Sequence, residues 1–235
     1  MGKLYCLAGA LFREGRWHIA WPLPAKSRDG PVRNVGWSPW LLDGHSRWEI
    51  FELLGPQPAA PEPPHLEDLW VRALKPLGRL APVEQRRQIL AATLAGSGEP
   101  LFGVNLSPSR LAAYLRPGTG LRSLATVVAT SEQIVFRVSQ RDGVAEPDVR
   151  ITLRVPGLDG RLLPVKDHHL LSRAEQAAPD LAGQVQVLNR TVRQMGPQVA
   201  VRLGLSRPFQ PRPDCQAGFC WLMADGFFSL ADPQP

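Results

Sequence analysis

The chain has few cysteines and no long apolar run. Its three cysteines, Cys6, Cys215 and Cys220, lack the CxxC spacing of a zinc knuckle. An odd number of cysteines does not complete a disulfide framework, so a reducing compartment is the default expectation. No stretch reaches the length of a membrane span, and the apolar start ends at Arg13, too soon for a signal peptide. We therefore expect a cytoplasmic chain that does not enter a membrane.

Catalytic, metal and cofactor signatures are also missing. The adjacent His168 and His169 would diverge on a helix or a strand, so they are poorly placed to hold one metal ion. Asp167 before them suits a helix N-cap. The glycine-containing turn at 117–120 lacks the lysine and serine or threonine of a phosphate-binding loop. We expect no catalytic residue, no metal and no cofactor, and a nuclease is the remaining enzymatic alternative.

The positive charges are nearly all arginine. Lysine and arginine together number 27 against 21 acidic residues, and the net charge is +6, yet only four of the cations are lysines. Arginine makes bidentate contacts to phosphate and stacks on bases, so this bias favours a polyanionic partner. A GC-rich genome or a hot environment would produce the same bias, and that alternative stays open.

The clearest structural pattern lies in residues 133–166. In residues 134–139 and 149–155, every second side chain is apolar, and the positions between them include arginine, serine and threonine. Turn residues separate the two stretches. Such period-two alternation with β-branched residues predicts an antiparallel meander with one apolar face. The opposite face would be basic. It would carry Arg137, Arg150, Arg154 and Lys166. The alternative is an ordinary solvated face, or salt bridges to Glu132, Asp142 and Glu146.

The remaining sequence divides the chain into three predicted parts. Residues 1–60 predict a first β-unit and residues 121–235 a second one. Residues 61–120 predict a helical insert between them. The fold class is therefore mainly β with a helical insert (α+β).

The first β-unit is expected to contain a hairpin over 3–23 and a strand over 47–54, with Trp48 turned inward. A proline-dense linker at 55–65 follows. In the insert, helices are predicted over 66–80, 83–96 and 109–115 from apolar spacing and from Pro82.

Strands are predicted in the second β-unit over 124–130, 198–205 and 218–229, besides the meander. A short helix is predicted over 168–178. The pattern of 183–196 leaves strand and helix open.

Aromatic and basic residues gather in the first β-unit, where they could stack on bases and contact phosphates. These residues are Arg13, Arg16, Trp17, Trp21, Arg33, Trp37 and Trp40. The alternative is that the tryptophans fill the core of that unit, because large aromatic side chains commonly pack inside.

Several stretches resemble the dual OB-containing domain family of prokaryotes. The opening strand with Cys6, Leu7 and Ala8, the Gly-Arg turn at 15–16 and the segment GWSPW at 36–40 are similar to its N-terminal part. The later matches are LLPVKDHHLLSR (162–173), GLSRPF (204–209) and GFCWLMADGFF (218–228). Departures at Ser38 and around Met223 indicate a divergent member.

This resemblance implies two OB-like barrels in one chain and a role as a binding module beside nuclease or mobile-element defence components. OB barrels bind single strands across one face and its loops. We therefore expect a non-catalytic subunit that binds RNA or DNA, or organises a ribonucleoprotein complex with a protein partner, in a prokaryotic antiviral-defence or mobile-element system (CRISPR-like or nuclease-associated). The alternative is a protein–protein adaptor that docks a larger effector without touching nucleic acid.

The residues expected to bind nucleic acid come from both β-units. They are Arg13, Arg16, Trp17, Trp21, Arg33, Trp37, Arg137, Arg150, Arg154 and Lys166.

Overall fold

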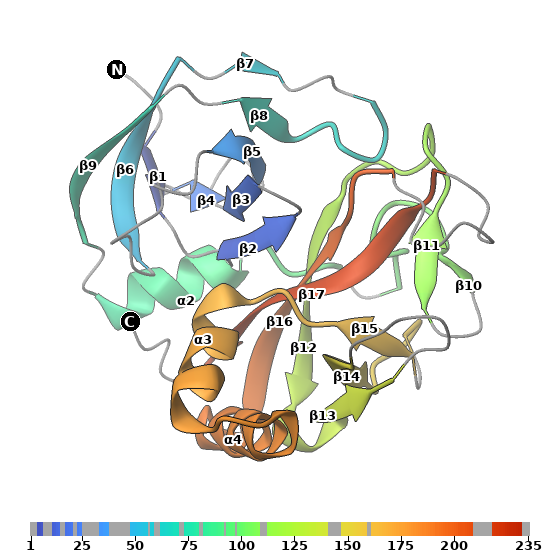
Figure 1. Cartoon of the computed structure of the whole chain (residues 1–235). Helices are drawn as coiled ribbons and strands as arrows, with labels where there is room; N and C mark the ends of the chain where they lie inside the picture. The colour runs from blue at the N-terminus through green and yellow to red at the C-terminus, as the bar shows by residue number, and fades with distance from the viewer. Residues whose placement is uncertain are drawn as a thin grey trace.

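The structure is a computed structural model of the chain (Figure 1). It describes residues 4–6, 11–14, 17–20, 23–24, 33–37, 48–55, 57–58, 62–70, 73–79, 82–91, 93–96, 98–108, 112–140, 147–158, 161–208 and 218–231. Before residue 48 the description covers the backbone only.

The protein is mainly β, as predicted. The strands before residue 80 form two sheets, with the orders β4-β1-β6-β9 and β2-β3-β5-β8-β7. They are β1 (Leu4–Cys6), β2 (Leu11–Glu14), β3 (Trp17–Ala20), β4 (Leu23–Pro24), β5 (Arg33–Trp37), β6 (Glu49–Leu54), β7 (Gln57–Pro58), β8 (Asp68–Trp70) and β9 (Ala73–Arg79). The expected hairpin is confirmed by the antiparallel pairing of β2 with β3, and the strand expected over 47–54 is β6.

The helix predicted over 66–80 is wrong, because this stretch forms β8 and β9. β9 pairs antiparallel with β6, and Leu77 is an extra residue that bulges out of the pair and is 46 % exposed. Pro76 lacks the N–H that a helix interior requires, and Gly78 has a φ of +138°, which is not helical. The apolar residues of 66–80 have helical spacing, but most of them lie on two short strands.

The other two helices predicted in the insert fare differently. Helix α2 (Val83–Ala91) is confirmed and starts directly after Pro82. The helix over 109–115 is wrong in its second half, which is the strand β11 (Ala113–Leu115), while residues 109–111 lie outside the described residues. The expected helical insert is therefore largely strand, and its strands join the sheets on either side.

The strands after residue 106 form two further sheets, with the orders β10-β11-β17-β16-β12 and β13-β14-β15. Besides β11 they are β10 (Ser107–Pro108), β12 (Leu124–Thr130), β13 (Ile134–Ser139), β14 (Asp148–Leu153), β15 (Leu162–Pro164), β16 (Gln198–Leu205) and β17 (Cys220–Ser229). The predicted meander and the strands predicted over 124–130 and 198–205 are confirmed, and β17 covers nearly all of the last one.

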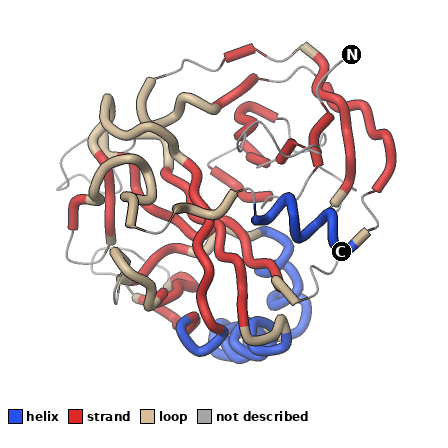
Figure 2. The backbone as a smooth tube through the Cα atoms, turned by 180° about the vertical axis from the view of Figure 1, so that it is seen from behind, coloured by secondary structure: helices blue, strands red, loops and turns tan. Residues whose placement is uncertain are grey.

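Two helices lie together at one end of the long strands β16 and β17 (Figures 1 and 2). Helix α3 (His168–Ala177) is confirmed with Asp167 as its N-cap, since this carboxylate accepts the Leu170 N–H at 3.1 Å. Residues 181–194 form helix α4 (Leu181–Gln194), which settles the open choice between strand and helix. Among the described residues, no helix is both long enough and apolar enough to cross a bilayer.

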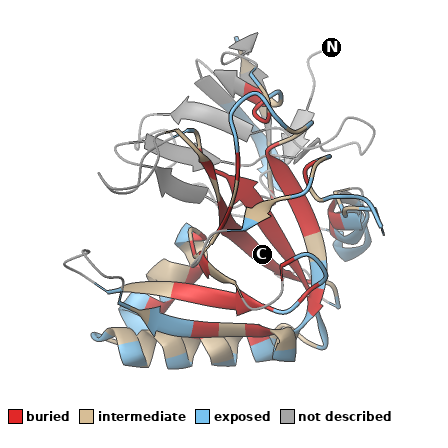
Figure 3. Cartoon of the chain, turned by 90° about the vertical axis from the view of Figure 1, so that its right-hand side faces the viewer, coloured by how far each residue is buried: buried red, intermediate tan, exposed pale blue. Residues whose placement is uncertain are grey.

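The main core lies between the sheet of β12, β16 and β17, the meander and helix α4. Figure 3 shows the buried residues concentrated on the strands. A smaller cluster joins the two halves of the chain through Trp48, Leu90, Leu124, Ala200 and Phe228. Trp48 is fully buried there, as expected.

Candidate nucleic-acid interface

The predicted basic residues of the meander do share one face of the sheet β13–β14–β15. Arg137 on β13 lies directly opposite Arg150 on β14, and Arg154 follows at the end of the same strand. The opposite face is the core side, where Phe136 and Ile151 are buried. The antiparallel pairing and the shared face of Arg137 and Arg150 that the alternation predicted are therefore confirmed.

Arg150 is not available to a ligand, which corrects its predicted role. Its side chain is 5 % exposed and lies against the carboxylate of Asp148, with Nε–Oδ1 and Nη2–Oδ2 distances of 2.9 and 3.0 Å. Its Nη1 also donates to the Leu162 carbonyl at 3.4 Å. Because its donors already have partners, Arg150 braces β14 against β15 and cannot make a bidentate phosphate contact without breaking this pair.

Arg137 and Arg154 are both exposed, and neither forms an ion pair in the described part of the chain. Two arginines directly opposite each other on neighbouring strands repel. Asp148 neutralises Arg150 and so relieves the repulsion between Arg150 and Arg137. The positive charge that remains on this face belongs to Arg137 and Arg154.

Lys166 lies beside this face, just beyond β15. It is half-buried, and its backbone N–H donates to the Ala224 carbonyl at 2.8 Å. The next residue, Asp167, is fully buried and also accepts the Phe227 N–H at 3.2 Å. The backbone of Lys166 is therefore fixed, while its role as a phosphate contact stays a prediction.

The predicted residues of the first β-unit fall on one sheet or outside the described residues. Arg13, Trp17, Arg33 and Trp37 belong to β2, β3 and β5, which are neighbours in the order β2-β3-β5. Their side chains are not described. Arg16, Trp21 and Trp40 lie outside the described residues. Whether this set binds or packs stays open.

A cluster of aromatic rings that the sequence did not reveal lies on β11 and next to β17. Tyr114 stacks on Phe219 with ring centroids 4.3 Å apart, and Trp221 lies 5.3 Å from Tyr114. All three residues are half-exposed. We name Tyr114, Phe219 and Trp221 the aromatic cluster. It was missed because residues 109–115 fit a helix, and only the pairing of Tyr114 with Trp221 brings the rings together.

Cations flank the aromatic cluster. Arg116 is exposed two residues after Tyr114, and the half-buried Arg161 donates from Nη1 to the Ala112 carbonyl at 3.1 Å. Arg161 directly precedes β15, so this bond ties the strand of Tyr114 to the sheet that carries Arg137 and Arg154. Half-exposed rings and free guanidinium groups therefore occur on connected elements.

A buried polar junction lies between β8 and β16, and it also escaped sequence reasoning. His65 Nδ1 lies 3.7 Å from Asp68 Oδ2, and Arg207 Nη2 lies 2.7 Å from the same oxygen. His65 Nε2 lies 2.9 Å from the Ser206 carbonyl, which can only accept, so this nitrogen carries the proton. The imidazole thus ties the turn that precedes β8 to the residue that follows β16. The i, i+3 spacing of His65 and Asp68 was the available signal.

Glu67 belongs to the same junction. Its Oε1 accepts the backbone N–H and the hydroxyl of Ser123, at 2.6 and 2.7 Å. Its Oε2 is buried, and nothing in the described part of the chain hydrogen-bonds to it. Burial raises the pKa of Glu67 above its ordinary value of 4.5 in spite of these hydrogen bonds.

Among the described residues, no group of histidine, cysteine, aspartate and glutamate side chains could hold a metal ion. Comparisons with protein-family models, with curated proteins and with solved structures find no match for the chain. The resemblance to the dual OB-containing domain family therefore stays a prediction.

Proposed function

We propose that the chain is a non-catalytic subunit that binds single-stranded nucleic acid. Arg137 and Arg154 contact phosphates, and the aromatic cluster stacks on bases. The observation that carries the proposal is that Arg137 and Arg154 form no ion pair within the described residues, where Asp148 is already bound to Arg150. Arginine side chains that keep their donors free are suited to phosphate contacts.

The aromatic cluster gives independent support. Rings that stack on bases bind single strands with little dependence on sequence, and such rings lie beside cationic grooves in OB-type proteins. Tyr114 and Trp221 each keep part of their surface exposed. The bond from Arg161 to Ala112 ties the strand of Tyr114 to the sheet of the arginines, so one strand of nucleic acid could use both groups.

We further propose that the two groups of sheets are OB-like barrels, as the family resemblance implies. In the described part of the chain, every strand before residue 80 pairs within two sheets, and every strand after residue 106 pairs within two others. This separation supports two β-units in one chain. The place of the protein in a prokaryotic defence or mobile-element complex belongs to the same proposal.

Fluorescence anisotropy with labelled single-stranded DNA, single-stranded RNA and duplex tests the proposal across a salt series. The logarithm of the affinity should fall linearly with the logarithm of salt concentration, by roughly 0.7 for each phosphate contact to a single strand. Arg137→Glu and Arg154→Glu should each weaken binding and lower this slope. Tyr114→Leu should weaken binding without changing the slope, because stacking releases no counterions.

Arg173→Glu is the matched control, since it makes the same change of charge at an exposed position on helix α3, outside the arginine face and the aromatic cluster. It should weaken binding less than either face variant. Arg150 is unsuitable for this test because it is buried and paired. Equal losses for all three charge reversals would indicate attraction by net charge alone. No binding at low salt would eliminate the proposal and leave the adaptor alternative.

A further inference from the structure

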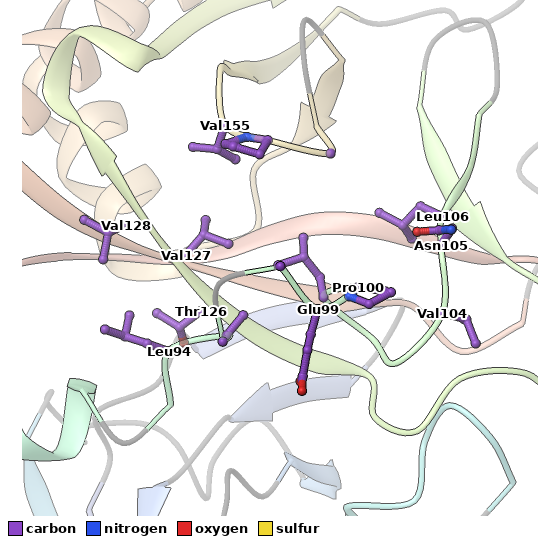
Figure 4. A pocket seen from close by; sticks show the side chains of 16 residues that line it. Leu94, Glu99, Pro100, Val104, Asn105, Leu106, Thr126, Val127, Val128 and Val155 are labelled. Atoms are coloured by element: carbon purple, nitrogen blue, oxygen red, sulfur yellow. The ribbon is translucent and has the colours of Figure 1, made fainter.

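A pocket of about 600 Å³ opens beside strand β12 (Figure 4). Its walls are residues 94–96, 98–101 and 104–106 on one side, the turn at 155–157 on another, and Thr126–Val128 of β12. Apolar side chains dominate the walls. Leu94 and Val128 are each 37 % exposed there.

Strand β12 is the edge of its sheet, so alternate residues turn their backbone groups away from β16. The Ser123 carbonyl accepts the Leu205 N–H of β16, which places residue 123 and every second residue after it on the inner side. The Thr126 carbonyl accepts the Ala95 N–H outside the sheet. Residues 124, 126, 128 and 130 therefore direct their N–H and C=O groups outward.

The outer edge of β12 has bonded neighbours on both sides of Val128. The Thr126 carbonyl is bound by Ala95, and the Thr130 N–H donates to Gln133 Oε1 at 2.8 Å. Within the described part of the chain, neither the N–H nor the C=O of Val128 has a hydrogen-bond partner. These two groups lie where Val128 lines the pocket. The pocket thus combines an apolar wall with one open position of a β-edge.

The pairing of Leu94 with Thr126 shows that this edge accepts an added strand, because the two residues form a parallel bridge. The chain turns away from β12 after Ala95, and Val128 is next along the edge. Glu99 is the charged side chain among the lining residues, and it is exposed. A ligand that satisfies these features has an extended backbone, apolar side chains and a cation.

We propose that this pocket docks an extended, apolar peptide segment of a partner protein, which pairs with Val128 and places a lysine or arginine at Glu99. Strand addition supplies affinity through main-chain hydrogen bonds, and the pocket selects the side chains. The proposal does not depend on nucleic-acid binding, because none of the residues named for that function lines this pocket.

Phage display of random eight-residue peptides on the full chain is the first test. We expect enrichment of peptides that alternate apolar residues and carry a lysine or arginine. Non-specific attraction to a chain of net charge +6 would select acidic peptides instead. The enriched peptides, synthesised with a fluorescent label, should bind with a micromolar Kd.

N-methylation of one peptide residue at a time tests strand pairing, because it removes one N–H without removing the side chain. Affinity should fall at least tenfold at the residue whose N–H donates to the Val128 carbonyl and remain within twofold at its two neighbours, whose N–H groups point away from β12. Val128→Arg should abolish binding. Val138→Arg is its matched control, since Val138 is a similarly exposed valine, 42 % exposed, on the edge strand β13 outside the pocket.

Glu99→Lys tests the charge. This variant should lose at least tenfold in affinity for the basic peptides and regain it for peptides in which glutamate replaces the lysine. Arg137→Glu with Arg154→Glu should leave peptide binding unchanged, which keeps this result separate from the nucleic-acid test.

Three results would overturn the proposal. The first is no enrichment of apolar, basic peptides. The second is indifference to N-methylation at every position, which would mean that the pocket takes an apolar ligand without strand pairing. The third is self-association in sedimentation that Val128→Arg abolishes, which would show that a second copy of the chain occupies the edge.

Discussion

Two edge strands in the C-terminal half of the molecule differ in how their outward backbone N–H and C=O groups are bonded. The outer edge of β13 is closed at Phe136, whose N–H donates to Asn189 Oδ1 at 3.0 Å and whose carbonyl accepts from Asn189 Nδ2 at 3.2 Å. The outer edge of β12 is bonded on either side of Val128, but no described side chain hydrogen-bonds to the backbone of Val128 itself. An edge strand exposes unpaired backbone groups that invite another strand, and proteins commonly cover them.

This difference distinguishes an edge position that the chain itself occupies, at Phe136, from one that an added strand could occupy, at Val128. One asparagine of helix α4 occupies the position that an added strand would take on β13, and α4 also covers the core there. At Val128 the comparable position borders a pocket with apolar walls. The edge at Phe136 therefore depends on the Asn189 side chain for its hydrogen bonds, whereas the edge at Val128 should tolerate the loss of its outward backbone N–H.

Paired proline substitutions at neighbouring valines of β12 test this with the largest expected effect. Val127→Pro removes a donor on the inner side of β12 and places the proline ring against β16, so we expect a loss of about 3 kcal/mol or more in the free energy of unfolding. Val128→Pro removes an outward donor that has no partner and should cost about 1 kcal/mol. Urea unfolding measures both. Equal costs would show that the outward orientation of Val128 is wrong.

Removal of the asparagine that closes β13 is the next largest effect. Asn189→Leu keeps the size of the side chain but leaves the N–H and C=O of Phe136 without partners beneath α4. Each unsatisfied buried group costs about 1–3 kcal/mol, so we expect a loss of about 2–3 kcal/mol after partial solvation. The measurement is again the urea midpoint. A neutral Asn189→Leu would mean that water replaces the asparagine without cost.

The sequence predicted the edge strand β13 but not the side chain that closes its edge. Alternation over 134–139 and 149–155 predicted β13, β14, their antiparallel pairing and the face of Arg137, because the side-chain period in a strand is fixed by geometry. It could not predict the bond of Asn189 to Phe136, since these residues are far apart in the chain and the segment of α4 fitted either structure. The open edge was not predictable either, because an edge is defined by the absence of a neighbour.

The errors in the sequence prediction share a cause. Residues 109–115 are too few to tell a strand period from a helix period without tertiary pairing, and in residues 66–80 the apolar residues of two separate strands fall by chance at helical spacing. The exposed role predicted for Arg150 failed for a similar reason. Its alternation was correct, but the bond to Asp148 two residues away on the same face turned a surface position into a buried brace.

Arg150→Ala should have a smaller effect, and it separates the paired arginine of the meander from the exposed Arg137. It removes the bonds to Asp148 and to the Leu162 carbonyl of β15. We expect a loss of about 2 kcal/mol in the free energy of unfolding, because Asp148, 37 % exposed, regains water. The salt slope of nucleic-acid binding should not change. Arg137→Ala should do the reverse, with stability altered by less than about 0.5 kcal/mol and a lower slope. A lower slope for Arg150→Ala would return Arg150 to the binding face.

The smallest effect concerns the start of β12, which Glu67 fastens through Ser123. Because burial raises the pKa of Glu67 above 4.5, the folded protein binds more protons than the unfolded chain between the two pKa values. Stability from this group is therefore complete at low pH and falls as pH rises from about 4.5, with a slope of at most about 1.4 kcal/mol per pH unit. Glu67→Gln should remove this slope, so the urea midpoints of the two proteins should diverge as pH rises. Parallel midpoints from pH 4.5 to 8 would show that the carboxyl is solvated and that β12 is held at its start by the strand pairing alone.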